Sequence, residues 1–212
     1  MGHGNYIDPF GGFVISGGAE GEVGKSFTVQ AGEHKEIRSI VLPGESREVR
    51  VDVDLVGEGA GLDMKGLYLC PADERVSFRI LVHHRVPGCV SRQLFKGIAG
   101  GTAHVVFDGT ILVAPDAQRT EAYQESHSLL LSETAVAETR PQLEIYADDV
   151  KCSHGATVGR LDPAERFYMR SRGIPEKEAE YLQMLSFLSP VLEGLSAEER
   201  SRVEEALSQM LA

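Results

Sequence analysis

Cysteine is scarce in this chain and tryptophan is absent. The 212 residues contain three cysteines, Cys70, Cys89 and Cys152. A small, odd number of cysteines argues against a disulfide framework and favours a reducing compartment. No N-terminal stretch has the pattern of a signal peptide, and no apolar run is long enough to span a bilayer. We therefore expect a cytoplasmic protein that does not contact the membrane.

Positive charge is also scarce. The sequence has 21 lysines and arginines against 32 aspartates and glutamates, a net charge of −11. A negative field of this size repels phosphate backbones, so nucleic-acid binding is disfavoured. Hydrophobic residues make up 42% and charged residues 25% of the chain, which is ordinary for a globular protein. This composition predicts one large domain, or one domain with a small appendage.

Helical periodicity is missing between about residues 26 and 160. This stretch consists of short β-type runs separated by Gly and Pro turn signals. In the clearest run, Glu48–Val56, the apolar side chains of Val49, Val51, Val53 and Leu55 alternate with charged ones, which is typical of a half-buried strand. Short, evenly spaced strands indicate a mainly β protein, namely a sandwich, a barrel or a β-solenoid. The absence of helical segments between them argues against βαβ winding.

The last fifty residues have a different pattern. Asp162 followed by Pro163 predicts a helix start, and Pro175 opens a second helix that Pro190 should kink or end. A capping box at Ser196–Glu199 begins a third helix. We expect the apolar faces of these helices to pack on the β-body, with a partner surface as the alternative.

These patterns predict three segments. They are a Gly-rich N-terminal arm at 1–25, a β core at 26–160 and a C-terminal helical domain at 161–212. Gly24-Lys25-Ser26 is reminiscent of a phosphate-binding loop, but a β-type run follows it where such a loop needs a helix N-terminus. Nucleotide binding at this position is therefore not expected.

Cys152 and His154 are the strongest candidate metal ligands. They are two residues apart, so in an extended backbone both side chains point to the same face. A thiolate and an imidazole can bind iron or zinc, and a neighbouring cation such as Lys151 is expected to lower the thiol pKa. Two ligands do not complete a site, and a subunit interface could supply the others.

The remaining cysteines and histidines give weaker signals. Cys70 and Cys89 stand alone near turns and are expected to be buried structural thiols. His83 and His84 are adjacent at a strand end and must face opposite sides, so they cannot share one metal ion. His127 is not flanked by a nucleophile pattern and is expected at the surface.

Two segments carry a resemblance to a known family. Residues 141–159 (PQLEIYADDVKCSHGATVG) and 167–174 (FYMRSRGI) closely resemble SufD-type members of the SufB/SufD family of the SUF iron–sulfur cluster assembly system. The resemblance implies a right-handed parallel β-helix core followed by a C-terminal α-helical domain. It also implies a scaffold rather than an enzyme, with no permanently bound cofactor and a transient iron or iron–sulfur cluster at a subunit interface.

The resemblance further implies partners. Family members pair with a SufB-like subunit through the β-helix, and each binds a SufC-like ABC ATPase through the helical tail. In that picture His154 matches an interface histidine that is a candidate iron ligand, with Cys152 beside it. The tail residues expected to contact the ATPase are Phe167, Tyr168, Arg170, Arg172, Gly173 and Ile174.

The sequence departs from the family pattern in two places. The additional N-terminal helical region of SufD proteins is not seen here, which suggests a short form. The stretch where SufB-like subunits carry a sulfur-accepting cysteine offers Ser126 and His127, so we do not expect this chain to accept persulfide sulfur. A homodimeric β-solenoid interaction protein without a cluster role remains the alternative function.

Overall fold

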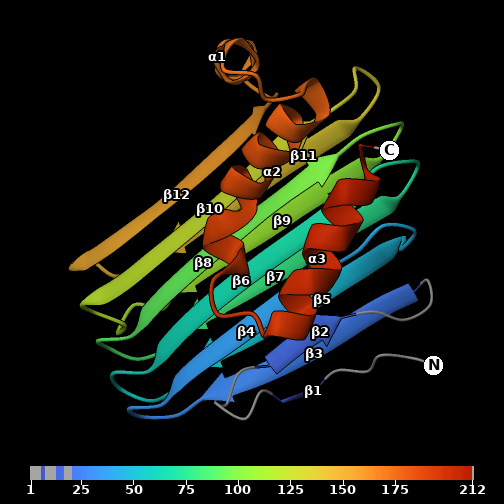
Figure 1. Cartoon of the computed structure of the whole chain (residues 1–212). Coiled ribbons are helices and arrows are strands. Elements are labelled where there is room, and N and C mark those ends of the chain that lie inside the picture. Colours follow the sequence, from blue (N-terminus) through green and yellow to red (C-terminus); the bar gives the residue numbers. More distant parts are fainter. Residues whose placement is uncertain (1–5, 8–12, 17–20, 212) are drawn as a thin grey trace.

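Parallel strands stacked in two sheets, followed by three helices, make up the computed structural model of the chain (Figure 1). The structure describes residues 6–7, 13–16 and 21–211. One sheet has the order β1-β2-β4-β6-β8-β10-β12 and is called sheet A below. The other, sheet B, has the order β11-β9-β7-β5-β3. The strands are β1 (Tyr6–Ile7), β2 (Phe13–Ser16), β3 (Gly21–Val29), β4 (His34–Val41), β5 (Arg47–Leu55), β6 (Gly61–Cys70), β7 (Arg75–His84), β8 (Val90–Ala99), β9 (His104–Val113), β10 (Thr120–Leu130), β11 (Val136–Ile145) and β12 (Val150–Gly159).

The chain alternates between the two sheets. From β3 onward each odd-numbered strand lies in sheet B and each even-numbered strand in sheet A, so one turn of chain adds one strand to each sheet. Every neighbouring pair is parallel except β1–β2, which is antiparallel. The predicted parallel β-helix with a C-terminal helical part is confirmed.

The interior of the β-helix is filled by side chains stacked in register from turn to turn. In β5 and β7 the buried positions alternate with exposed or half-buried ones, because successive side chains of a strand point to opposite faces. Three phenylalanines form the centre of the core, with ring centroids 5.5 Å apart for Phe78 and Phe95 and 4.7 Å apart for Phe95 and Phe107. Phe95 of β8 in sheet A thus packs against Phe78 of β7 and Phe107 of β9 in sheet B, which joins the two sheets across the core.

Two of the helices cover the outer face of sheet A (Figure 1). They are α2 (Glu176–Leu192) and α3 (Ala197–Gln209), and they follow α1 (Pro163–Ser171). Their apolar faces pack against outward-pointing side chains of β4, β6 and β8, which confirms the expected packing on the β-body. The fully or nearly fully buried members of this layer include Ile40, Leu67, Leu69, Ile98, Met184, Leu188, Val203 and Leu207.

The helix boundaries follow the predicted caps. The Asp162 carboxylate accepts a hydrogen bond from the Ala164 N–H, and Ser196 and Glu199 form the reciprocal capping box. Pro190 neither begins nor ends a helix, because α2 runs through it and ends two residues later at Leu192. No helix within residues 21–211 is both long and apolar enough to cross a membrane.

Only part of the predicted N-terminal arm lies within the described residues. β1, β2 and the first residues of β3 fall within the predicted arm, while positions 1–5, 8–12 and 17–20 lie outside the described residues. β3 begins at Gly21, so the β-structure starts before residue 26. Gly24, Lys25 and Ser26 lie inside this strand, so no helix N-terminus follows them as a phosphate-binding loop would require.

Candidate functional site

The last turn of the β-helix leaves one end of the stack open. β12 ends the order of sheet A and β11 ends the order of sheet B, so each pairs with one strand only in the part of the chain that the structure describes. Most side chains of β12 are exposed. The large apolar side chains exposed at or beside this end are Val136, Ile145, Tyr146 and Val158. An open strand edge of this kind is a ready template for pairing with another chain.

Cys152 and His154 lie on the inward face of this last turn. Cys152 is in register with Ala122 of β10, and His154 is in register with Gln124. Both β10 residues are completely buried and therefore point into the β-helix. In-register residues of a parallel pair share a face, so the structure places both candidate ligands on one side, as the spacing predicts.

The two candidates differ in exposure. Cys152 is half-buried beside a small apolar cluster of the last turn, whose fully or nearly buried members are Ile111, Val113, Ala117, Ala122 and Ala147. His154 is exposed at the open end. A metal ion bound by both side chains would therefore lie at the boundary between the core, where the thiol is, and solvent, where the imidazole is.

The predicted activation of the thiol by Lys151 is wrong. Lys151 points to the opposite face, where its Nζ lies 2.9 Å from the Glu121 Oε1 on the neighbouring strand. Burial raises the pKa of the Cys152 thiol, only partly offset by a hydrogen bond with the Ala122 backbone. The thiol is therefore mostly protonated at neutral pH.

This chain alone does not assemble a full metal site. Among residues 6–7, 13–16 and 21–211, no cluster of three or more His, Cys, Asp or Glu side chains has the geometry to hold a metal ion. Cys152 and His154 are donors of a type that suits iron or zinc, but they supply two ligands where three or four are needed. The donor set fits one half of a site at an interface.

The cysteines and histidines with weaker sequence signals are buried in the core, half-buried or hydrogen-bonded to neighbouring side chains. Cys70 and Cys89 are completely buried, and burial raises the pKa of each thiol. His84 is buried with its Nε2 2.8 Å from the Ser91 Oγ, whereas His83 is half-buried on the other face. His127 lies on the outer face of sheet A, where Nδ1 is 2.7 Å from the Thr157 Oγ1.

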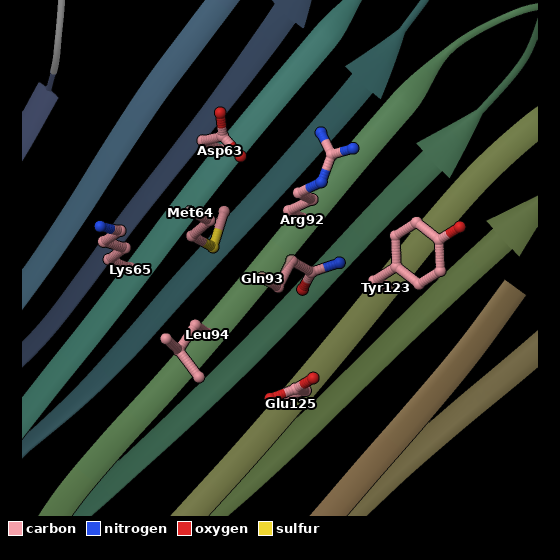
Figure 2. A pocket seen from close by; sticks show the side chains of 8 residues that line it. All are labelled: Asp63, Met64, Lys65, Arg92, Gln93, Leu94, Tyr123 and Glu125. Carbon is pink, nitrogen blue, oxygen red and sulfur yellow. The ribbon is translucent and has the colours of Figure 1, made fainter. Parts of the chain in front are cut away.

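A buried polar column inside the β-helix was not predicted from the sequence. Met64, Gln93 and Gln124 occupy the same inward register on β6, β8 and β10, and Figure 2 shows the first two side by side on neighbouring strands. The Gln124 Nε2 donates a hydrogen bond to the Gln93 Oε1 at 2.9 Å. The sequence signal that could have indicated this pair is a glutamine at an inward-facing position in each of two strands one turn apart, Gln93 and Gln124.

The outer face of sheet A carries a shallow groove beyond the helices (Figure 2). Its volume is about 370 Å³, and β6, β8 and β10 all contribute to it. The Arg92 guanidinium lies 6.0 Å from the centre of the Tyr123 ring at its side. The outward side chains that line the groove are Asp63, Lys65, Arg92, Leu94, Tyr123 and Glu125.

The helical tail presents a second exposed surface. α1 has no buried residue, and the Phe167 and Tyr168 side chains are 74% and 60% exposed. Gly173 ends the α1 segment with a φ of +87°, a conformation that favours glycine. Arg172 lies over the Tyr168 ring at 5.4 Å, Arg170 lies 3.4 Å from Glu176, and Ile174 is half-buried.

A groove lined by both polar and apolar side chains adjoins this surface. It has a volume of about 520 Å³ and is bridged by an ion pair at 2.6 Å between Arg166 of α1 and Glu180 of α2. Its other lining residues come from the end of β10, the linker before α1 and the end of α3: Leu130, Leu131, Arg160, Leu161, Met210 and Leu211. Arg166 belongs to the same helix as Phe167 and Tyr168, but none of the residues expected to contact an ATPase lines this groove.

Comparison with known proteins identifies the family of the chain. A sequence model described as "SUF system FeS cluster assembly, SufBD core domain" matches residues 23–187. The iron–sulfur cluster assembly protein SufD of Escherichia coli is 39% identical over 160 residues, which cover 76% of this chain and 38% of that protein. SufD of Bacillus subtilis is 35% identical over 145 residues, covering 68% and 33%.

A more distant relative matches a longer stretch. An iron–sulfur cluster assembly SufBD family protein of Mycobacterium leprae is 31% identical over 182 residues, which cover 82% of this chain and 46% of that protein. The chain thus spans less than half the length of each of these relatives. The family match runs from β3 into α2 and includes the open end with Cys152 and His154. The chain therefore belongs to the SufBD family of the SUF iron–sulfur cluster assembly system.

Proposed function

We propose that this chain is a non-catalytic scaffold subunit in iron–sulfur cluster assembly. It pairs through the open end of its β-helix with a SufB-like subunit or with a second copy of itself, and it binds a SufC-like ABC ATPase through its helical tail. The observation that carries the proposal is the pair of soft donors, Cys152 and His154, on the inward face of a terminal strand with one open edge, in a chain of this family.

The open end is suited to pairing. The β11 and β12 edges offer free backbone donors and acceptors, and the exposed Ile145, Tyr146 and Val158 side chains add apolar surface. A second subunit docked there would cover His154 and add the ligands that this chain lacks. Iron or a nascent cluster would then be held as cargo between the two subunits.

The chemistry of Cys152 favours holding cargo over catalysis. A catalytic nucleophile needs a lowered thiol pKa, but burial raises the pKa of this thiol. A metal ion arriving from a partner would displace the thiol proton and bind the thiolate. The chain therefore contributes position and ligands, and the ATPase contributes the energy.

The helical tail is suited to a separate partner. α1 projects from the body with Phe167 and Tyr168 exposed, and the adjoining groove offers both apolar and charged side chains. Large exposed aromatic side chains of this kind are typical anchors of protein interfaces. α2 and α3 fix this surface to sheet A, so movement of a bound ATPase would be transmitted to the β-helix.

Paired surface variants test the two contacts independently. The full chain is co-expressed with the SufC-like ATPase and the SufB-like subunit of its host and purified by a tag on this chain. Phe167→Ser with Tyr168→Ser should lose the ATPase and retain the paired subunit. Ile145→Ser with Tyr146→Ser, which changes exposed side chains at the other surface, should show the reverse pattern.

The outcomes separate the proposal from its alternative. Retention of the ATPase by both double variants would contradict the tail as its docking site. Recovery of copies of this chain alone, with no iron after anaerobic reconstitution, would favour the homodimeric interaction protein without a cluster role.

A further inference from the structure

One register position links the interior of the β-helix to the candidate ligand His154. Met64 of β6, Gln93 of β8, Gln124 of β10 and His154 of β12 follow one another across sheet A. Met64, Gln93 and Gln124 are buried, whereas His154 at the open end is exposed. Figure 2 shows the beginning of this column, with Met64 and Gln93 on adjacent strands.

The column leaves two buried amide atoms without a hydrogen-bond partner, the Gln93 Nε2 and the Gln124 Oε1. Gln124 is completely buried and donates from Nε2 to the Gln93 Oε1 at 2.9 Å, but its own Oε1 has no hydrogen-bond partner. A buried carbonyl oxygen without a donor is unfavourable and calls for a structural or functional reason. The amide nitrogen and oxygen branch from one carbon in different directions, so an amide whose nitrogen donates toward β8 has its oxygen turned away from β8, and β12 is the other neighbour of β10.

Sheet B leaves room for this amide. Gly109 of β9 faces it across the interior, and a Cβ added there would lie 2.7 Å from both polar atoms of the Gln124 amide. Any larger residue at position 109 would displace the amide. The fold therefore accommodates a full glutamine side chain directly below the last turn.

We propose that Gln124 is a positioning residue for His154. When a partner and the metal order the His154 ring, the Gln124 Oε1 accepts a hydrogen bond from one ring N–H. This bond selects one tautomer and leaves the other ring nitrogen, facing the open end, as the metal ligand. The inference rests on the proposed function, since it assumes that His154 holds iron or a cluster.

Two substitutions separate positioning from packing. Gln124→Met keeps the shape and removes the acceptor, while Gln124→Glu keeps an acceptor oxygen at the same reach. Gln93→Glu is the matched control, because it changes a buried side chain one turn away and keeps an acceptor oxygen for the Gln124 Nε2, so the Gln124 oxygen stays in place. The full chain is studied in its paired form, with Zn²⁺ as a diamagnetic probe for iron.

The main readout is the ¹⁵N chemical shifts of the His154 ring, assigned with His154→Ala. In the wild type and in Gln93→Glu, Zn²⁺ should occupy a single ring nitrogen. In Gln124→Met it should distribute over both nitrogens, and its affinity should fall by roughly 10- to 100-fold, as is typical for loss of an outer hydrogen bond to a metal ligand. Gln124→Glu should retain the single bound nitrogen.

The failures of the two proposals are distinguishable. If His154→Ala and the wild type bind Zn²⁺ alike, the ligand role of His154 is wrong and this inference falls with it. If His154→Ala abolishes binding but Gln124→Met keeps the wild-type nitrogen and affinity, the proposed function stands and the positioning role is wrong. An equal effect of Gln93→Glu and Gln124→Met would also overturn the positioning role, because general loosening of the core would then be the cause.

Discussion

Tyr68 of β6 and Ser128 of β10 are hydrogen-bonded at 2.6 Å, although strand β8 lies between them. The residue of β8 in register with both is Gly97, and a Cβ there would overlap the Tyr68 ring. The tyrosine therefore passes over the glycine and reaches two strands along the stack. Burial raises the pKa of Tyr68, so its hydroxyl is neutral over the whole physiological range.

Removing the Tyr68 hydroxyl should destabilise the fold measurably. Tyr68→Phe leaves the buried Ser128 hydroxyl without this partner, which typically costs about 1–3 kcal/mol of unfolding free energy. Tyr68→Phe combined with Ser128→Ala removes both polar groups and should recover part of that loss. Urea denaturation of Tyr68→Phe, Ser128→Ala and the double variant measures the interaction energy between the two hydroxyls. Losses of unfolding free energy that simply add in the double variant would contradict a stabilising bond between them.

Gly97→Ala should be destabilising for a different reason. The added methyl group collides with the Tyr68 ring inside the packed core, and overpacking of this kind costs about 1–3 kcal/mol. Gly159→Ala is the control, because a Cβ at that position meets no atom within 4 Å. Equal denaturation midpoints for the two variants would show that the Tyr68 ring can move aside.

The sequence pattern predicts most strands but does not reveal β10. The inward residues of that strand include Ala122, Gln124, Ser126 and Ser128, which are small or polar, so no apolar alternation marks it. They are tolerated inside because Gln124 bonds to Gln93 one turn away and Ser128 bonds to Tyr68 two turns away. Such pairing depends on registry between segments about thirty residues or more apart, which local periodicity cannot show.

The candidate site was predictable in its local part only. The two-residue spacing of Cys152 and His154 predicts their shared face because strand geometry is local. The environment of the thiol is not local, since its burial arises from β9 and β10, and Lys151 is drawn to Glu121 thirty residues earlier. The hydrogen bond between Gln93 and Gln124 likewise depends on the stacking of the turns, which the sequence alone does not show.

His84 should make stability depend on pH. Burial, and secondarily the charge of His83, lowers the pKa of His84 from 6.5 to about 4. The unfolded chain binds a proton at higher pH than the folded chain, so the stabilisation is fully present above pH 6.5 and is lost as the pH falls toward 4. Between about pH 7.5 and about pH 5 this loss amounts to about 2 kcal/mol.

Denaturation midpoints at several pH values, compared with those of His84→Gln, measure this contribution. The glutamine keeps a polar side chain near Ser91 but does not titrate. Its stability should therefore fall less steeply with decreasing pH. Parallel pH profiles for the two proteins would assign the acid sensitivity to other groups.

The three thiols should differ in reactivity. Cys70 and Cys89 are completely buried, whereas Cys152 is half-buried at the open end. Only Cys152 should react with iodoacetamide in the folded chain, slowly at neutral pH because its pKa is raised, and roughly tenfold faster per unit of pH up to that pKa. Peptide mass spectrometry after timed labelling identifies the site, with labelling of all three in urea as the reference.

The same labelling tests the pairing surface. A subunit docked on β11 and β12 should protect Cys152, since the thiol would then lie inside the interface. Unchanged labelling of Cys152 in the purified pair would place the contact elsewhere on the chain.

The open last turn has an energetic consequence. In a stacked solenoid each repeat is stabilised by its neighbours, so a terminal repeat with one neighbour unfolds locally at lower free energy than the repeats within. Here that repeat rests on its own small cluster around Ile111 and Ala122, apart from the phenylalanine core. Fraying of β12 and loss of the ligand pair are then one event, so a docked subunit that suppresses the fraying also gathers the ligands. Assembly and the completion of folding are thermodynamically linked at this end of the molecule.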